Sequence, residues 1–150
     1  MNKIILTAVA ATFVAGSALA TAWAGAHGSM SDKRVDGMKH IGGGMQALGD
    51  VAKGNAPADA AAVAKAKEVK MLVDQIPSWF PEGSMEYRAK AEIWSDWAGF
   101  KAAADDSAKA AANLVSAAES MDPGAIGAAL GGLGKTCGGC HKAYRGPKPG

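Results

Sequence analysis

The sequence has 150 residues, with 16 basic and 14 acidic side chains and a formal net charge of +2. This nearly balanced charge gives no strong positive field, so we expect the chain to bind neither nucleic acid nor a membrane surface. The length suits a single domain. Aromatic side chains are few, with three Phe, two Tyr and four Trp, whereas glycine occurs 20 times. We therefore expect a thin apolar core.

Residues 1–24 have the pattern of a secretory signal peptide. Lys3 supplies a positive charge, residues 4–14 form an apolar run, and Ala22-Trp23-Ala24 is a small-x-small cleavage signal. The run is too short to span a bilayer, so we favour a cleaved signal over an uncleaved anchor. Cleavage after Ala24 is the first choice and after Ala20 the second. The mature domain, residues 25–150, is then expected in the periplasm with 15 basic and 14 acidic residues, because only Lys3 is lost.

Hydrophobic periodicity predicts four helices and no strand. We expect the first helix to be capped by Ser31-Asp32 and to end at Gly54-Asn55. The second helix starts after Pro57, with Asp59 near its beginning, and runs to Ile76. The loop after it, residues 77–87, carries Trp79 and Phe80, which we expect to cover the core.

The third helix is predicted from Arg88 or Ala89 to Met121. Asp122-Pro123 then predicts an N-cap followed by a proline in the first turn of a fourth helix. The inward stripe of that helix is expected to contain Ile126, Leu130, Leu133, Cys137, Cys140 and Tyr144. Four helices with short connections predict an all-α, antiparallel up-down-up-down four-helix bundle.

Near the end of the fourth helix, Cys137-Gly138-Gly139-Cys140-His141 has the spacing used for covalent attachment of haem c. Each thiol adds across one vinyl group of the porphyrin, and the imidazole binds the iron. Residues three and four apart share a helix face, so Cys137, Cys140 and His141 point the same way. We therefore expect one haem c in the core of the bundle, where it adds apolar bulk and leaves no cysteine for a disulfide.

Two other functions use a C-x-x-C motif. A redox dithiol of the thioredoxin-like type normally opens a helix in a βαβ context, and the sequence has no parallel strand pattern. A zinc site would need further ligands, and only His27 and His40 are available. We therefore favour haem attachment and expect a carrier or binding protein that is not an enzyme.

A haem motif at the C-terminal end of a four-helix bundle resembles the class II c-type cytochromes, the cytochrome c′ family. The resemblance covers the mature chain and implies redox partner proteins in the periplasm and either a monomer or a homodimer formed through the first two helices. The residues that carry it, besides the haem motif, are Arg34, Ala52-Lys53-Gly54, Ile76-Pro77, Trp79-Phe80, Glu92-Ile93-Trp94 and Tyr144-Arg145.

The family has two branches, which differ in what faces the iron opposite the proximal histidine. In cytochrome c′ proper an apolar side chain blocks that face, and the five-coordinate, high-spin iron can take nitric oxide or carbon monoxide. In the low-spin branch a methionine of the first helix binds the iron within an Arg-x-x-x-Met-Lys pattern. Residues 34–39 fit this pattern, which implies an electron carrier with His141 and Met38 as iron ligands. The gas-binding function is the alternative.

Physical chemistry supports Met38 as a candidate, because a thioether is a soft, neutral ligand that suits haem iron. Methionines at helical spacing are also common core residues, so Met38 could instead only cover the haem. Met45, two turns further on, is the alternative ligand. Arg34 lies one turn before Met38 and is expected to pair with a haem propionate, as Arg145 could also do.

Gly42, His40 and His27 also bear on the expected site. Gly42, one turn after Met38, lowers helix stability at a core face, which suggests that a flat group approaches the backbone there. His40 is two positions from Met38 and is expected on the surface. His27 is expected to have no role in the site.

Overall fold

The computed structural model describes residues 29–148. The expected signal peptide, its cleavage sites after Ala24 and Ala20, and His27 lie outside the described residues. The elements in chain order are α1 (Met30–Ala52), α2 (Ala60–Gln75), the 3-10 helix η1 (Ile76–Trp79), α3 (Glu92–Ser95), α4 (Trp97–Glu119) and α5 (Pro123–Tyr144).

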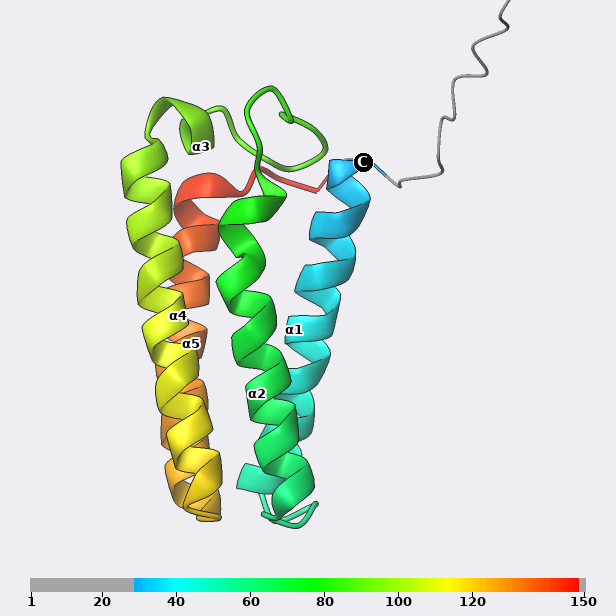
Figure 1. Ribbon diagram of the computed structural model, residues 1–150, viewed down its shortest axis with the longest axis vertical. Coiled ribbons are helices and arrows are strands. Elements are labelled where there is room, and N and C mark those ends of the chain that lie inside the picture. The colour runs from blue at the N-terminus through cyan, green and yellow to red at the C-terminus, as the bar shows by residue number, and fades with distance from the viewer. Residues whose placement is uncertain (1–28, 149–150) are drawn as a thin grey trace, which may run out of the picture.

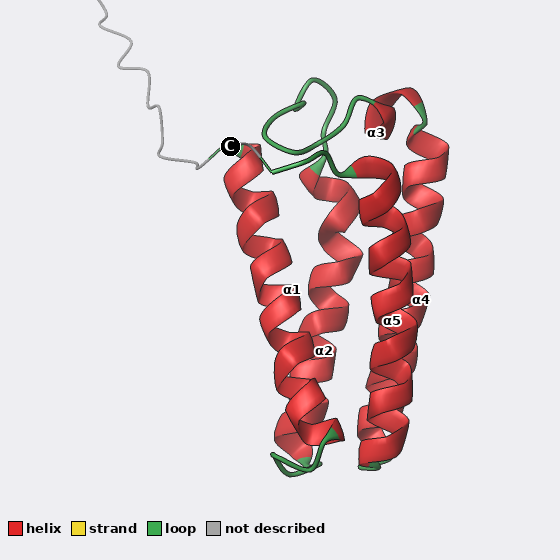
Figure 2. Ribbon diagram, turned by 180° about the vertical axis from the view of Figure 1, so that it is seen from behind, coloured by secondary structure: helices red, strands yellow, loops and turns green. Residues whose placement is uncertain are grey.

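The four long helices α1, α2, α4 and α5 lie side by side, and successive helices run in opposite directions (Figures 1 and 2). This confirms the predicted antiparallel four-helix bundle. The N-terminal end of α1, the C-terminal end of α5 and the segment between η1 and α3 meet at the same end of the bundle. Within residues 29–148, no helix is both long enough and apolar enough to cross a membrane.

The first helix begins two residues earlier than predicted, because its cap is Ser29 and not Ser31-Asp32. The backbone N–H of Asp32 donates to Ser29 Oγ at 3.2 Å, and the backbone N–H of Ser29 donates to Asp32 Oδ2 at 3.0 Å. This reciprocal pair is a capping box, in which Asp32 at the third helical position satisfies the cap's own N–H. The helix ends at Ala52, and Gly54 follows in the left-handed region with φ of 77°.

Two aspartates start the second and the last long helix, as the sequence predicts. Asp59 Oδ1 accepts the backbone N–H groups of Ala61 at 2.8 Å and Ala62 at 3.2 Å. At the start of α5, Asp122 Oδ1 accepts the N–H of Gly124 at 2.8 Å, and Pro123 occupies the first helical position. Both caps satisfy backbone donors that would otherwise have no partner.

The predicted start of the third helix was wrong, because the backbone of residues 88–90 pairs with the C-terminal end of the chain. The N–H of Gly146 donates to the carbonyl of Arg88 at 2.7 Å, and the N–H of Lys90 donates to the carbonyl of Tyr144 at 3.2 Å. The helical path then breaks again at Asp96, whose Oδ1 accepts the N–H of Gly99 at 3.1 Å and caps α4. Helical structure on this side therefore begins with the short α3 and continues as α4.

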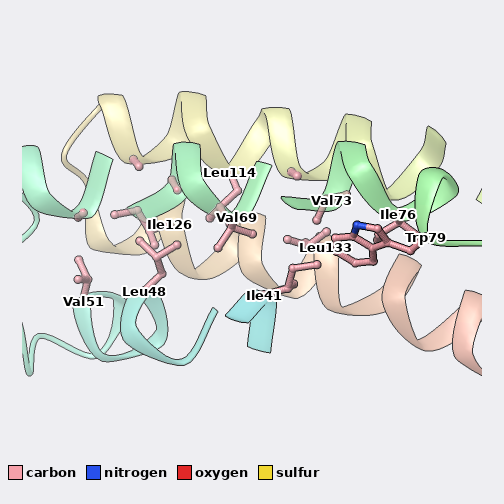
Figure 3. Packing of buried hydrophobic residues seen from close by; sticks show 14 of the residues in the cluster. Ile41, Leu48, Val51, Val69, Val73, Ile76, Trp79, Leu114, Ile126 and Leu133 are labelled. Atoms are coloured by element: carbon pink, nitrogen blue, oxygen red, sulfur yellow. The ribbon is translucent and has the colours of Figure 1, made fainter. Parts of the chain in front are cut away.

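The core is a layer of aliphatic side chains between the four long helices (Figure 3). Leu48, Val69, Leu114, Ile126 and Leu133 are each at most 1% exposed. The side chains of Trp79 and Phe80 are buried at the end of this layer, which confirms that they cover the core.

Candidate functional site

One cavity brings together the residues that the sequence selects. It has a volume of about 420 Å³ and is bordered by Arg34 and Met38 of α1 and by Cys137, Cys140 and His141 of α5. Further walls come from α2, η1, α4 and the segment before α3. A shallower groove of about 640 Å³ between α2 and α4 contains none of these five residues.

The haem-attachment motif lies on the last two turns of α5, facing this cavity. Cys137 and Cys140 are free, half-buried thiols. Burial raises the pKa of both thiols, so they are protonated at neutral pH. Within residues 29–148 no three His, Cys, Asp or Glu side chains are grouped to hold a metal ion, so the zinc alternative finds no further ligands there.

His141 is half-buried beside the thiols. Burial lowers the pKa of its imidazole, and the positive charges of Arg145 and Arg88 lower it further. Both effects disfavour the imidazolium form. The neutral imidazole has a free nitrogen lone pair, which is the form that binds a metal ion.

The inner face of α1 offers two methionines to the cavity. Met38 and Met45 are both half-buried and both border it. Gly42 borders it between them, and no atom of residues 29–148 that could clash lies within 4 Å of the position that a Cβ would take there. The bare backbone at Gly42 therefore leaves room for a flat group, as the sequence predicts. His40 points elsewhere, because its exposed ring binds the carbonyl oxygen of Asp36 at 2.8 Å through Nδ1.

Arg34 is 6% exposed and held by the chain after α2. Its Nε donates to the carbonyl oxygen of Trp79 at 2.7 Å, its Nη2 donates to Ser84 Oγ, and its guanidinium lies 4.4 Å from the Phe80 ring centroid. Burial lowers the pKa of Arg34, and the charge of Glu86 opposes that shift.

The third nitrogen of the Arg34 guanidinium remains to be accounted for. Within residues 29–148, Nη1 of Arg34 is buried and has no hydrogen-bond partner. A buried, unpaired donor costs about 1–3 kcal/mol, more for a charged group, unless it finds an acceptor. Because Arg34 borders the cavity, an anionic oxygen of a group bound there would satisfy it. The residues present thus fit a haem, with two thiols, an imidazole and a cation for a propionate.

Aromatic residues that the sequence left without a role in the site form another wall. Phe80, Phe100 and Tyr144 border the cavity, with ring centroids 4.9 Å apart for Phe80 and Phe100 and 5.3 Å apart for Phe100 and Tyr144. The Tyr144 hydroxyl donates to Asp96 Oδ2 at 3.3 Å, which fixes the ring. The available signal in the sequence was helical periodicity, which places Tyr144 on the inward stripe of the last helix.

The segment before α3 closes part of the rim. Glu86, Tyr87 and Arg88 border the cavity, although no local sequence pattern indicates this. A carboxylate oxygen of Glu86 accepts the backbone N–H of Ser31 at 3.3 Å, which ties the segment to the first turn of α1. Tyr87 lies in the left-handed region with φ of 54°, which is rare for a bulky side chain and which the contacts on either side hold in place.

Comparison with known proteins identifies the family. The family model described as Cytochrome C′ matches residues 29–145. The chain belongs to the cytochrome c′ family. Members of this family bind one covalently attached haem c, so this is the cofactor of the chain.

Individual relatives agree with this assignment. Cytochrome c′ of Rhodospirillum rubrum is 38% identical over 143 residues, covering 93% of this chain and 92% of the relative. Cytochrome c-556 of an Agrobacterium tumefaciens strain is 39% identical over 116 residues, covering 76% and 94%. A variant of cytochrome c prime from Alcaligenes xylosoxidans, solved as a nitric oxide complex, has a TM-score of 0.74 and 32% identity, covering 79% and 94%.

Proposed function

We propose that the chain is a periplasmic haem c protein that binds a diatomic gas, nitric oxide or carbon monoxide, at the haem face away from His141. The observation that carries this proposal is that Met38 of α1 and His141 of α5 border the same cavity. The nitric oxide complex of the Alcaligenes relative supports the choice of ligand. From the sequence alone, gas binding was the alternative to electron transfer. The relatives named cytochrome c′ favour gas binding.

Covalent attachment is the role proposed for Cys137 and Cys140. Each S–H would add across one vinyl double bond, forming a thioether without any oxidant, so the two thiols need only be reduced and close to the porphyrin. His141 would bind the iron through its neutral imidazole. The bound haem supplies an iron centre that can take up a gas molecule or change its oxidation state by one electron.

The other residues orient the group and exclude water. Arg34 would pair its unpaired Nη1 with a propionate, while its other nitrogens remain bound to Trp79 and Ser84. Phe80, Phe100 and Tyr144 form an apolar wall. The Met38 side chain would lie over the open face and limit which ligands reach it, since a thioether offers no hydrogen-bond donor to a polar ligand.

A second candidate function is single-electron transfer with the Met38 thioether as the second iron ligand. It is favoured by the position of Met38 on the cavity wall and by the Arg-x-x-x-Met-Lys pattern of residues 34–39. Two permanent protein ligands would leave little to rearrange when an electron moves. In this case redox partner proteins, and not gases, would be the physiological partners.

Absorption spectra of the purified ferric and ferrous protein separate the two functions. Gas binding predicts a high-spin spectrum without the weak near-infrared band of thioether ligation, and a ferrous spectrum that changes when carbon monoxide or nitric oxide is added. A ferric near-infrared band, together with a ferrous spectrum that carbon monoxide leaves unchanged, would overturn gas binding and favour the electron carrier.

A further inference from the structure

The α1 residue next to Met38 is a glycine whose missing side chain is replaced by the indole of Trp79. A Cβ on Gly37 would overlap Cη2 of Trp79 and lie 2.8 Å from Cζ2 and Cζ3, closer than carbon atoms pack. Gly37 is buried and Trp79 is 8% exposed, so this contact lies in the interior of the protein. Figure 3 shows Trp79 beside Ile76 at the end of the core.

Trp79 is also held by its backbone. Its carbonyl oxygen accepts the 2.7 Å hydrogen bond from Arg34 Nε, and Arg34 lies three residues before Gly37. Residues three apart share a helix face, so one residue of η1 contacts two successive turns of α1 on the same face. These contacts fix the distance between η1 and the turn of α1 that carries Met38.

Neither Gly37 nor Trp79 is among the residues that border the cavity, whereas Met38 is. The pair can therefore influence the cavity only through neighbouring residues, and the most direct route is α1, which carries both Met38 and Arg34. Protein interiors are close-packed, so a side chain that adds volume forces neighbouring elements apart. A methyl group between Trp79 and α1 would move α1 outward and draw Met38 away from the cavity.

We propose that the contact between Gly37 and Trp79 is a positioning element that sets how closely Met38 covers the haem. Gly37 lets α1 approach η1, and the rigid indole stops that approach at a fixed distance. This inference rests on the proposed function in so far as Met38 lies over the iron, but it concerns a different pair of residues. Its consequence is that ligand access is determined partly by two residues outside the cavity.

The test uses the haem-loaded protein and four variants: Gly37→Ala, Trp79→Phe, the double variant, and Gly43→Ala as control. Gly43 lies on the same helix and is exposed, and in the described part of the chain no neighbouring atom lies within 4 Å of the position that a Cβ would take there. We expect Gly37→Ala to speed carbon monoxide association with the ferrous protein by about tenfold, since displacements on the order of 1 Å have effects of this size or more. The ferric absorption spectrum should shift with it.

The double variant should return both readouts toward the wild-type values, because a phenylalanine ring is shorter than an indole and leaves room for the added methyl group. Trp79→Phe alone opens a gap above Gly37, and we expect α1 to settle closer, so carbon monoxide association should slow. Gly43→Ala should match the wild-type protein. Circular dichroism checks that each variant is folded. If Gly37→Ala does not fold, the test rests on Trp79→Phe, and a carbon monoxide association rate equal to that of Gly43→Ala would then contradict the positioning role.

A folded Gly37→Ala protein with the same spectrum and association rate as Gly43→Ala would overturn the positioning role. Failure of the proposed function looks different. If the wild-type protein binds neither carbon monoxide nor nitric oxide, gas binding is wrong, and the positioning role is then judged by the ferric spectrum and the midpoint potential. These two must still differ between Gly37→Ala and Gly43→Ala, or the inference is also wrong.

Discussion

Arg34 contributes both to the stability of the fold and to the proposed haem site. Two of its nitrogens hold the segment after α2, through Trp79 and Ser84, and the third is buried without a partner among residues 29–148, while Arg34 as a whole borders the cavity. The sequence indicated the possible propionate contact, because Arg34 lies one turn before Met38. It could not indicate the Trp79 carbonyl or Ser84, since these partners lie 45 and 50 residues away, respectively, and no local pattern relates them to Arg34.

Replacement of Arg34 by glutamine should lower the free energy of unfolding by about 1–3 kcal/mol, because acceptors that are buried lose their donor. Urea denaturation followed by circular dichroism measures this. Lys33→Gln is the matched control, since Lys33 is the exposed neighbour on the same helix and should change stability little. Equal stability of the two variants would contradict the structural role given to Arg34.

Met38 is the residue that we expect to control the access of gas molecules to the haem. Met38→Ala should speed carbon monoxide association with the ferrous protein at least about tenfold, equivalent to about 1.4 kcal/mol of barrier. Stopped-flow absorption measures the rate. Met71→Ala serves as control, because Met71 is 54% exposed on α2 and does not border the cavity.

The accompanying spectrum then identifies how Met38 acts. A thioether ligand would make the wild-type protein low-spin and the Met38→Ala protein high-spin, whereas a covering side chain would leave both high-spin. An association rate that is the same for wild type, Met38→Ala and Met71→Ala would exclude Met38 from both roles.

At the scale of elements, caps and breaks decide where each helix presents its side chains. Asp59 and Asp122 were predictable as caps, because the proline and aspartate signals are local. The start of the third helix was not predictable, since the backbone of residues 88–90 is hydrogen-bonded to residues 144–146, which are far away in the sequence. Helical periodicity alone predicts a helix through such a segment, because it does not show that a distant part of the chain competes for its backbone hydrogen bonds.

The cap of α5 gives a prediction at this scale. Asp122→Ala should lower the free energy of unfolding by about 1 kcal/mol, because the N–H of Gly124 loses its acceptor. Asp105→Ala is the control, since Asp105 is exposed in the middle of α4. Urea titration of the three proteins compares them, and an Asp122→Ala curve that coincides with wild type would show that the cap does not stabilise the fold.

At the scale of the molecule, the bundle was predictable because each helix carries an apolar stripe, and burial of all stripes requires four packed helices. The convergence of Met38 with Cys137, Cys140 and His141 was predictable for the same reason, since all lie on inward faces. The rim formed by residues 86–88 was not, because its path depends on contacts with both ends of the chain.

The central claim is that a haem c joined to α5 by Cys137 and Cys140 fills the cavity of this bundle. Mass spectrometry of the protein purified from the periplasm of a host with a working haem c maturation system tests it directly. We expect a polypeptide heavier by the mass of one haem, with the addition on the peptide that contains residues 137–141. A folded helical protein of unmodified mass with two free thiols would contradict it.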